Sequence, residues 1–254
     1  MKKHIIRYAS FAFAILGMVS CSEEQETALR PQDAKSTPMT FLVNHPGQAT
    51  RATETSFEQN DRIGLYVADA KAQLEIGGNL VNNEALTYDG SKWAAARTLY
   101  WDKGIYTAYA YYPYMEDVSS ITDQPFSVVL DQSTAKSKEA LGGYEASDLL
   151  FATSKNISAS ASPIPLNFKH IMSKLKIRLI KGEDFEGDMP TTAQVTIHNT
   201  VPTATIDLQA GVATRYVKGT RKSIIAHQDD ATSYSAIIVP QRIENRMPLI
   251  RSEE

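Results

Sequence analysis

Alternation of apolar and charged residues is the strongest structural signal in this chain, and it is clearest at residues 174–179. Charged residues occupy the even-numbered positions, Lys174, Lys176 and Arg178, and aliphatic residues occupy the odd-numbered ones, Leu175, Ile177 and Leu179. Successive side chains of a β-strand point to opposite faces, so this segment is predicted to be a strand with one solvated face and one core face. Just upstream, at 166–168, the apolar positions are even-numbered. This change of phase predicts a β-bulge or a sharp bend between Lys169 and Ser173.

Further short segments of this kind predict strands over most of the chain beyond residue 38. The expected strands are 39–45, 61–68, 85–88, 92–94, 126–130, 148–153, 163–168, 174–180, 195–198, 205–208 and 234–239, and the aromatic segment 99–114 lies among them. Turn-forming pairs such as Asp89-Gly90 separate these segments. The one segment with a pattern compatible with a helix is 134–141, and it is short. The fold class is therefore expected to be all-β, with strands packed as a β-sandwich.

A loop rich in Asp, Glu and Gly at 182–190 separates two groups of predicted strands. The strand pattern stops before this loop and resumes at Val195. We therefore expect two domains, an N-terminal β-sandwich at 39–182 and a C-terminal β domain at 191–254.

The N-terminus has the organisation of a secretory signal peptide. Lys2, Lys3 and Arg7 precede an apolar run at 8–19, which is too short to span a bilayer because spanning takes about 20 residues. Residues 1–20 are therefore predicted to be a cleaved signal peptide. The single cysteine, Cys21, follows directly and resembles the cysteine of a bacterial lipobox, where a fatty acyl chain such as palmitate is attached. The alternative is an ordinary signal peptide with an incidental cysteine.

Residues 21–38 are polar and are predicted to form a flexible tether behind the lipidated cysteine. Lipid attachment would anchor the protein in a membrane without a spanning segment. The formal charge of the chain is −3, from 26 Lys and Arg against 29 Asp and Glu. Loss of the signal peptide removes three cations and no acid, which gives 23 − 29 = −6. This charge argues against a nucleic-acid partner and against attraction to an anionic membrane surface.

No pattern of catalytic or metal-binding residues stands out. The five histidines are scattered and none lies at metal-ligand spacing from a Cys, Asp or Glu. Motifs for nucleophilic serine, bound nucleotide or catalytic zinc are absent from the sequence. His170, in the region of the phase change, is expected to satisfy backbone groups of a bulge rather than to act as a base. We therefore expect no enzyme activity, catalytic residue, metal site or cofactor.

The tyrosines of 106–112 divide between the two faces of a predicted strand. Tyr109 and Tyr111 share one face, and Tyr106 and Tyr112 occupy the other. They do not form a single binding stripe, so core packing is the favoured interpretation over stacking on sugars or protein partners.

Three segments resemble a known family. They are the D-L-L-x-A run at 148–152, the F-x-H-x-x-S-K-L run at 168–175 and the aromatic run at 109–114. Together they resemble the fimbrillin family, subunits of the type V pili of anaerobic Gram-negative bacteria, and the resemblance extends from Cys21 to about Gln241. It implies a two-domain β-sandwich of transthyretin-like topology and a lipid-anchored pilus subunit on the outer membrane that contributes to adhesion.

The resemblance also implies a route of assembly. Fimbrillins polymerise by strand exchange after a protease cuts behind an N-terminal strand at an arginine; here the matching residue is Arg51, and the new N-terminus would be Ala52. Other pilus subunits would be partners by β-strand addition. Family members usually continue beyond Pro240-Gln241, so the second domain is expected to be incomplete at its C-terminus. Three explanations stay open: a truncated product, an accessory subunit, or a form whose open second domain needs a partner.

Two other functions stay open at this point. One is a surface lipoprotein that binds a glycan or a host protein without polymerising. The other is a surface hydrolase, which would need carboxylates clustered in a cleft.

Overall fold

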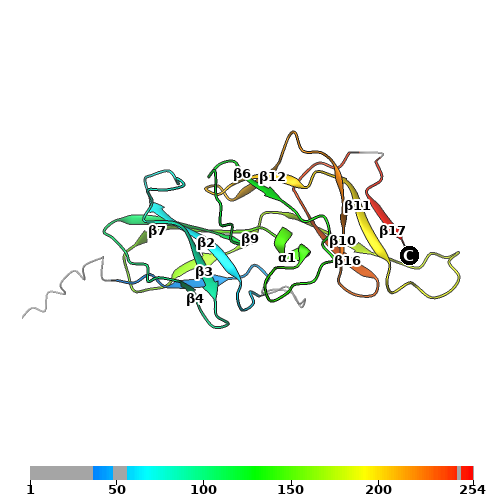
Figure 1. Ribbon diagram of the computed structural model, residues 1–254, viewed down its shortest axis with the longest axis horizontal. Coiled ribbons are helices and arrows are strands. Elements are labelled where there is room, and N and C mark those ends of the chain that lie inside the picture. The colour runs from blue at the N-terminus through cyan, green and yellow to red at the C-terminus, as the bar shows by residue number, and fades with distance from the viewer. Residues whose placement is uncertain (1–36, 48–55, 245–246, 254) are drawn as a thin grey trace, which may run out of the picture. The chain divides into compact units, whose positions relative to one another are not determined.

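The computed structural model describes residues 37–47, 56–244 and 247–253, and these form β-strands and one short helix (Figure 1). The strands are β1 Phe41–Asn44, β2 Arg62–Asp69, β3 Val81–Tyr88, β4 Trp93–Ala95, β5 Ile105–Tyr112, β6 Gln124–Ser127, β7 Leu150–Ser158, β8 Ile164–Asn167, β9 Lys169–His170, β10 Ser173–Arg178, β11 Gln194–Thr200, β12 Thr203–Asp207, β13 Val212–Arg215, β14 Lys222–Ile225, β15 His227–Gln228, β16 Ser233–Ile238 and β17 Ile250–Glu253, and helix α1 is Gly143–Ser147. The expected all-β fold class is confirmed. No helix among the described residues is long and apolar enough to cross a bilayer.

A six-stranded antiparallel sheet in the order β4-β3-β2-β5-β7-β9 is the centre of the fold. Its strands β2 and β5 have almost no polar face, because nearly every side chain in them is buried. Gly64 of β2 lies opposite Tyr111 of β5, and a Cβ atom at Gly64 would lie 2.3 Å from the tyrosine ring. The absence of a side chain there lets the ring lie flat over the neighbouring strand.

Each face of this sheet belongs to a different hydrophobic core. The N-terminal core contains Met39, Ile63, Leu65, Val67, Leu86, Trp101, Tyr106, Ala108, Tyr112, Leu150, Ile164, Leu166 and Phe168. The shared core contains Tyr66, Tyr109, Tyr111, Phe151, Val195, Ile197, Ile206, Leu208, Ile224, Tyr234 and Ile237. The predicted division of the tyrosines between two faces is therefore confirmed, and they pack in the cores.

Segments on either side of the 182–190 loop contribute to the shared core and to a common sheet. Strand β6 pairs with β12, which in turn pairs with β13 (Figure 1). The turn after β12 ends at Gly211, whose φ is +66° and whose Cβ position lies 2.1 Å from the ring of Phe151 in β7. A side chain at Gly211 would collide with that ring. The division into domains 39–182 and 191–254 stays a proposal.

The phase change near Lys169 is a bend at which the chain moves between sheets. Strand β8 pairs in parallel with β1, β9 pairs with β7, and β10 pairs with β16. In β10 the three charged side chains are exposed and the aliphatic ones are half-buried against the shared core, as the alternation predicts. Because each short strand joins a different partner, the apolar face changes from even to odd positions.

Residues 134–141, the one segment with a pattern compatible with a helix, are not helical. Ser137 instead forms a turn, in which its N–H donates to the Ala140 carbonyl at 2.9 Å and its hydroxyl accepts from the N–H of Ala140 at 3.0 Å. The helix is α1, which begins just after the segment. Tertiary contacts override the local helix propensity of 134–141, because Lys136 reaches Asp61 at the start of β2, at 2.9 Å.

A buried glutamine just before residues 134–141 joins this part of the chain to the C-terminal sheet. Gln132 is 0% exposed. Its Nε2 donates to the Ile237 carbonyl at 2.7 Å, and its Oε1 accepts from the Ile237 N–H at 2.8 Å. Strand β15 pairs with β16 only at Tyr234 and Ser235, so the amide of Gln132 takes the place of a strand neighbour at Ile237.

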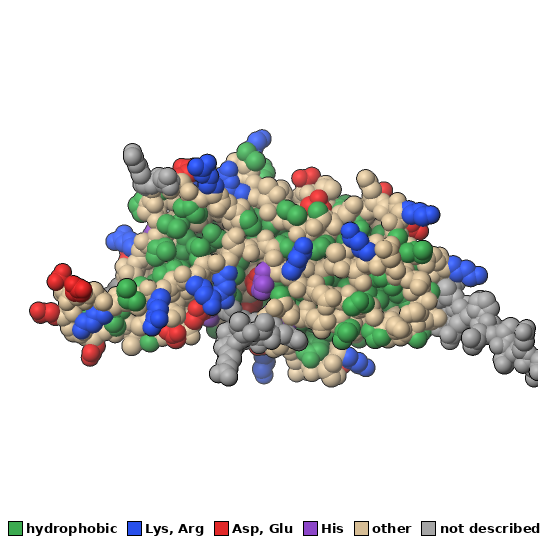
Figure 2. Space-filling view, turned by 180° about the vertical axis from the view of Figure 1, so that it is seen from behind, with side chains coloured by type: hydrophobic (Ala, Val, Ile, Leu, Met, Phe, Trp, Pro, Cys, Tyr) green, Lys and Arg blue, Asp and Glu red, His purple; other side chains and the backbone are tan. Residues whose placement is uncertain are grey.

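Charges are mixed over the surface. On the face drawn in Figure 2, basic and acidic side chains are interspersed and apolar side chains lie between them. This distribution is typical of a solvated protein surface.

We expect Gln132→Met to lower the free energy of unfolding by about 2 to 5 kcal/mol, because the buried N–H and C=O of Ile237 lose their partner while side-chain volume is retained. The control is Gln59→Met at an exposed position, which should change it by less than about 0.5 kcal/mol. Urea unfolding followed by tyrosine and tryptophan fluorescence measures both. If Gln132→Met were as stable as wild type, the two hydrogen bonds from Gln132 to Ile237 would not contribute to stability.

Candidate functional site

Strand β1 and the four residues before it, 37–40, lie between two other segments of the chain. On one side β1 runs parallel to β8, with Ile164 N–H donating to the Thr40 carbonyl at 2.8 Å and Phe168 N–H donating to the Asn44 carbonyl at 3.0 Å. On the other side, residues 99–101 lie beside the residues that precede β1. Met39 N–H donates to the Leu99 carbonyl at 2.8 Å, and Trp101 N–H donates to the Thr37 carbonyl at 3.0 Å. We call these two flanking segments, β8 and 99–101, the β1 seat.

The side chains of this strand alternate between the N-terminal core and solvent. Met39 is buried, and Phe41 and Val43 are half-buried against the same core. Leu42, between them, is 54% exposed. The burial of Phe41 and Val43 is therefore partial, and Met39 is the most deeply buried apolar residue of 37–44.

Thr37 and Pro38, the last residues of the predicted tether, also belong to this arrangement. Thr37 is 6% exposed, and Pro38 forms a β-bridge with Tyr100. The rest of the tether, the signal peptide and Cys21 lie outside the described residues.

Aromatic rings hold the chain on both sides of 48–55, the segment that contains Arg51 and Ala52 and lies outside the described residues. The rings of His45 and Phe57 are 4.8 Å apart, edge to face. Phe57 also contacts the rings of Trp93, Tyr112 and Phe168, with centroids 5.0, 5.4 and 5.6 Å away. The two ends of the segment are thus side by side, and Phe57 is anchored in the N-terminal core independently of β1.

Charged groups lie next to this aromatic cluster. The Lys136 ammonium is 2.9 Å from Asp61 Oδ1 and 2.9 Å from Glu58 Oε2. Burial lowers the pKa of Lys136, but the hydrogen bonds to the two carboxylates outweigh it and the net pKa is raised. Lys136 is therefore a charged ion-pair partner and not a neutral nucleophile or base.

His170 interacts with a carboxylate. Its Nδ1 lies 2.9 Å from Asp148 Oδ1, and its ring is 6.2 Å from that of His45. A carboxylate 22 residues upstream gave no local signal in the sequence. The expectation of a backbone partner for His170 stays a prediction.

The described residues contain no group of three or more His, Cys, Asp or Glu side chains that could hold a metal ion. The charged groups near the β1 seat are explained by ion pairs. The seat itself is a strand site, in which backbone groups on two sides and apolar contacts below hold an extended segment.

Comparison with known proteins gives relatives over most of this chain. A family model described as fimbrillin-like matches residues 50–251. A protein classed as a fimbrium tip subunit of Bacteroides ovatus is 26% identical over 198 residues, which cover 70% of this chain and 36% of that protein. A fimbrium subunit of Bacteroides uniformis is 26% identical over 248 residues, which cover 94% and 76%. The chain thus spans about a third of the length of the B. ovatus relative.

Solved structures of proteins described as cell adhesion proteins have a similar fold. One from B. uniformis has a TM-score of 0.59 and 21% identity, over 83% of this chain and 76% of that chain. One from B. ovatus has a TM-score of 0.58 and 18% identity, over 82% and 79%. At these identities the likeness concerns the fold.

We expect Tyr112→Phe to make the protein less sensitive to alkali. Burial, and then the carboxylates of Asp61, Glu145 and Asp148, raise the pKa of Tyr112 far above its ordinary value of 10.0. Above about pH 10 the unfolded chain loses this proton while the folded protein keeps it, so the free energy of unfolding falls as pH rises.

In Tyr112→Phe this fall, measured by urea unfolding between about pH 9 and about pH 12, should be less steep. Tyr100→Phe serves as the control because Tyr100 is 49% exposed. A pH profile of Tyr112→Phe that overlays the wild type would rule out the buried phenol as a source of alkaline instability.

Proposed function

Because the chain belongs to the fimbrillin-like family, we propose that it is a lipid-anchored subunit or accessory subunit of a cell-surface fimbria, assembling by strand exchange at the β1 seat. A structural role, not an enzymatic one, is typical of this family. The observation that carries the proposal is that residues 37–44 are bonded through their backbone to two segments, with Thr37 and Met39 bonded to 99–101 and β1 paired with β8, yet contact only one of the two cores.

Removal of this strand would create a receptor for another strand. Loss of residues 37–44 would leave the backbone groups of β8 and 99–101 without partners and would expose the apolar surface under Met39, Phe41 and Val43. Burial of these three side chains, one fully and two in part, is worth roughly 3 to 6 kcal/mol. A donor strand that restores both the hydrogen bonds and the burial would bind by β-augmentation.

The rest of the protein is expected to stay folded after the loss of residues 37–44. No residue of 37–44 is part of the shared core, and Phe57 keeps the chain behind the cut packed against Tyr112 and Phe168. An opened N-terminal core would then lie on a sheet whose other face is still covered.

The finer features of the proposal follow the family. They are a two-domain organisation at 39–182 and 191–254, a transthyretin-like topology, an outer-membrane lipid anchor at Cys21, and other pilus subunits as partners, with adhesion to a host or glycan receptor as the role of the fimbria. Relatives described as cell-adhesion and fimbrium proteins support a location at the cell surface.

The first test is proteolysis at Arg51. An arginine-specific protease at limiting dose should give one main product with Ala52 at its N-terminus, read by mass spectrometry, and Arg51→Gln should resist this cut. Cut protein should then bind a synthetic peptide of sequence 37–45 more tightly than uncut protein does. The same peptide with Phe41→Asp and Val43→Asp should fail to bind, because charged groups cannot enter the apolar part of the seat.

Two results would refute strand exchange. One is the absence of a preferred cut at Arg51. The other is a cut protein that binds neither peptide while keeping the stability of the uncut form; this second result would favour a surface lipoprotein that binds its receptor without polymerising.

A separate test concerns the anchor. Cys21→Ala protein should leave the membrane fraction of cells and should incorporate no labelled palmitate, whereas Ser22→Ala should behave as wild type. One cysteine is present in the sequence, so the label reports on a single site. Retention of Cys21→Ala in membranes, together with an unlabelled wild type, would exclude lipid anchoring at this residue.

A further inference from the structure

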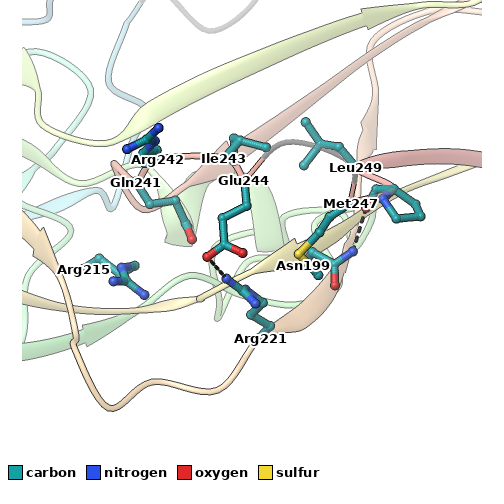
Figure 3. Close-up of a pocket in the computed structure, with 10 residues that line it drawn as sticks. Asn199, Arg215, Arg221, Gln241, Arg242, Ile243, Glu244, Met247 and Leu249 are labelled. Carbon is teal, nitrogen blue, oxygen red and sulfur yellow. Dashed lines mark hydrogen bonds and ion pairs between the residues drawn. The ribbon is translucent and has the colours of Figure 1, made fainter.

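Three arginines line a hollow between β11, β13 and the segment before β17 (Figure 3). The hollow has a volume of about 180 Å³ and is lined by Asn199, Arg215, Arg221, Gln241, Arg242, Ile243, Glu244, Met247, Pro248 and Leu249. Arg215 and Arg221 lie on one side of it and the chain from Gln241 to Glu244 on the other. Arg221 forms an ion pair with Glu244. Arg215 and Arg242 form no ion pair with a described residue.

Hydrogen bonds to the backbone fix the walls of this hollow. Gln241 accepts from the Val201 N–H at 2.9 Å and donates to the Val201 carbonyl at 3.1 Å, which holds Arg242 beside the end of β11. Asn199 has a φ of +60° where the register of β11 shifts, and its amide donates to the Pro248 carbonyl at 2.7 Å. The arginines therefore project from a braced backbone.

A second hollow adjoins the first and is also basic. It has a volume of about 520 Å³ and shares Asn199, Arg221 and Pro248 with the first; His198, Lys222, Ser223, Ile250 and Arg251 complete its lining. Together the two hollows are lined by five cations, Arg215, Arg221, Lys222, Arg242 and Arg251, and by the carboxylate of Glu244. Arg221 is paired with Glu244 and Arg251 with Glu253, so Arg215, Lys222 and Arg242 carry the surplus charge. This surplus of positive charge contrasts with the net charge of −3 of the chain.

We propose that these two hollows form a binding site for an acidic saccharide, a sugar chain that carries sulfate or carboxylate groups. Arginine binds such groups through two parallel N–H bonds, and among the described residues no carboxylate is ion-paired with Arg215 or Arg242. The neutral polar side chains of Asn199, Ser223 and Gln241 supply the hydrogen-bonding groups that sugar hydroxyls need. The site shares no residue with the β1 seat, so it does not depend on strand exchange.

The lining argues against a single-stranded nucleic acid as the ligand. Neither hollow is lined by Phe, Tyr or Trp, and single-stranded nucleic acids are bound largely by stacking on such rings. The volume of the larger hollow lies in the range of roughly 300 to 1,000 Å³ that is usual for small-molecule sites. The site is thus suited to discrete anionic groups on a compact ring.

The test measures binding of a fluorescent chondroitin sulfate tetrasaccharide to the purified full chain by anisotropy. Wild type should bind it and should not bind a neutral chitotetraose. Arg215→Ala/Arg242→Ala should weaken binding by about tenfold or more, since hydrogen bonds to charged groups are lost. Arg215→Lys/Arg242→Lys keeps the charge but not the paired donors. Its affinity should lie between that of wild type and that of the double alanine variant.

The matched control removes the same charge elsewhere. Lys155→Ala/Lys176→Ala changes two exposed lysines of β7 and β10 and should leave binding unchanged. Circular dichroism checks that each variant is folded, which is expected because Arg215 and Arg242 are exposed.

Glu244→Gln is expected to strengthen binding of the tetrasaccharide rather than to weaken it. It removes the one carboxylate among the described residues that line the two hollows and releases Arg221, so the tetrasaccharide should bind up to about fivefold more tightly. The proposal is overturned if the two double alanine variants weaken binding equally, if Glu244→Gln weakens it, or if chitotetraose binds as well. Tighter binding of an oligodeoxynucleotide or of phosphatidylserine vesicles than of the tetrasaccharide would overturn it too.

Discussion

The six-stranded sheet has apolar side chains on both faces, and this requirement for cover on two sides governs the rest of the structure. In β5, Tyr106 and Tyr112 enter one core while Tyr109 and Tyr111 enter the other. Burying such rings contributes a large part of the hydrophobic free energy of a small protein. Strands β1 and β8 take part in covering one face. The other face needs residues from beyond the 182–190 loop, so the two parts of the chain depend on one another.

The N-terminal core and the shared core also differ in how their contacts are assembled. The N-terminal core is closed at one border by β1, a four-residue strand at the start of the described chain, whereas the shared core is assembled from strands far apart in sequence. Short strands with few buried contacts open at a lower free energy than the centre of a fold. Opening at the β1 seat would therefore have limited consequence for Tyr111, Phe151 and the residues packed on them.

The sequence predicts what is local. The alternation in β10, the turn at Asp89-Gly90 and the two faces of the tyrosine segment depend on neighbours in the chain, and the structure confirms them. Contacts with distant residues decide the rest. Residues 134–141 are not helical, and Lys136 in this segment forms an ion pair with the distant Asp61. The bend at Lys169 occurs where β8, β9 and β10 pair with three different strands. The basic hollows combine residues of β11, β13 and the chain before β17, whose separate positions carry no common pattern.

The amide of Gln132 has a consequence for how the C-terminal sheet can grow. A sheet edge with unpaired N–H and C=O groups attracts further strands. At Ile237 these groups are already bonded to a side chain, and a side chain cannot pass the pairing on to another molecule. The opposite border, β10, presents Lys174, Lys176 and Arg178 to solvent, and their mutual repulsion discourages a second copy. For a protein crowded beside identical neighbours, the two borders together act as a safeguard against unregulated lateral aggregation.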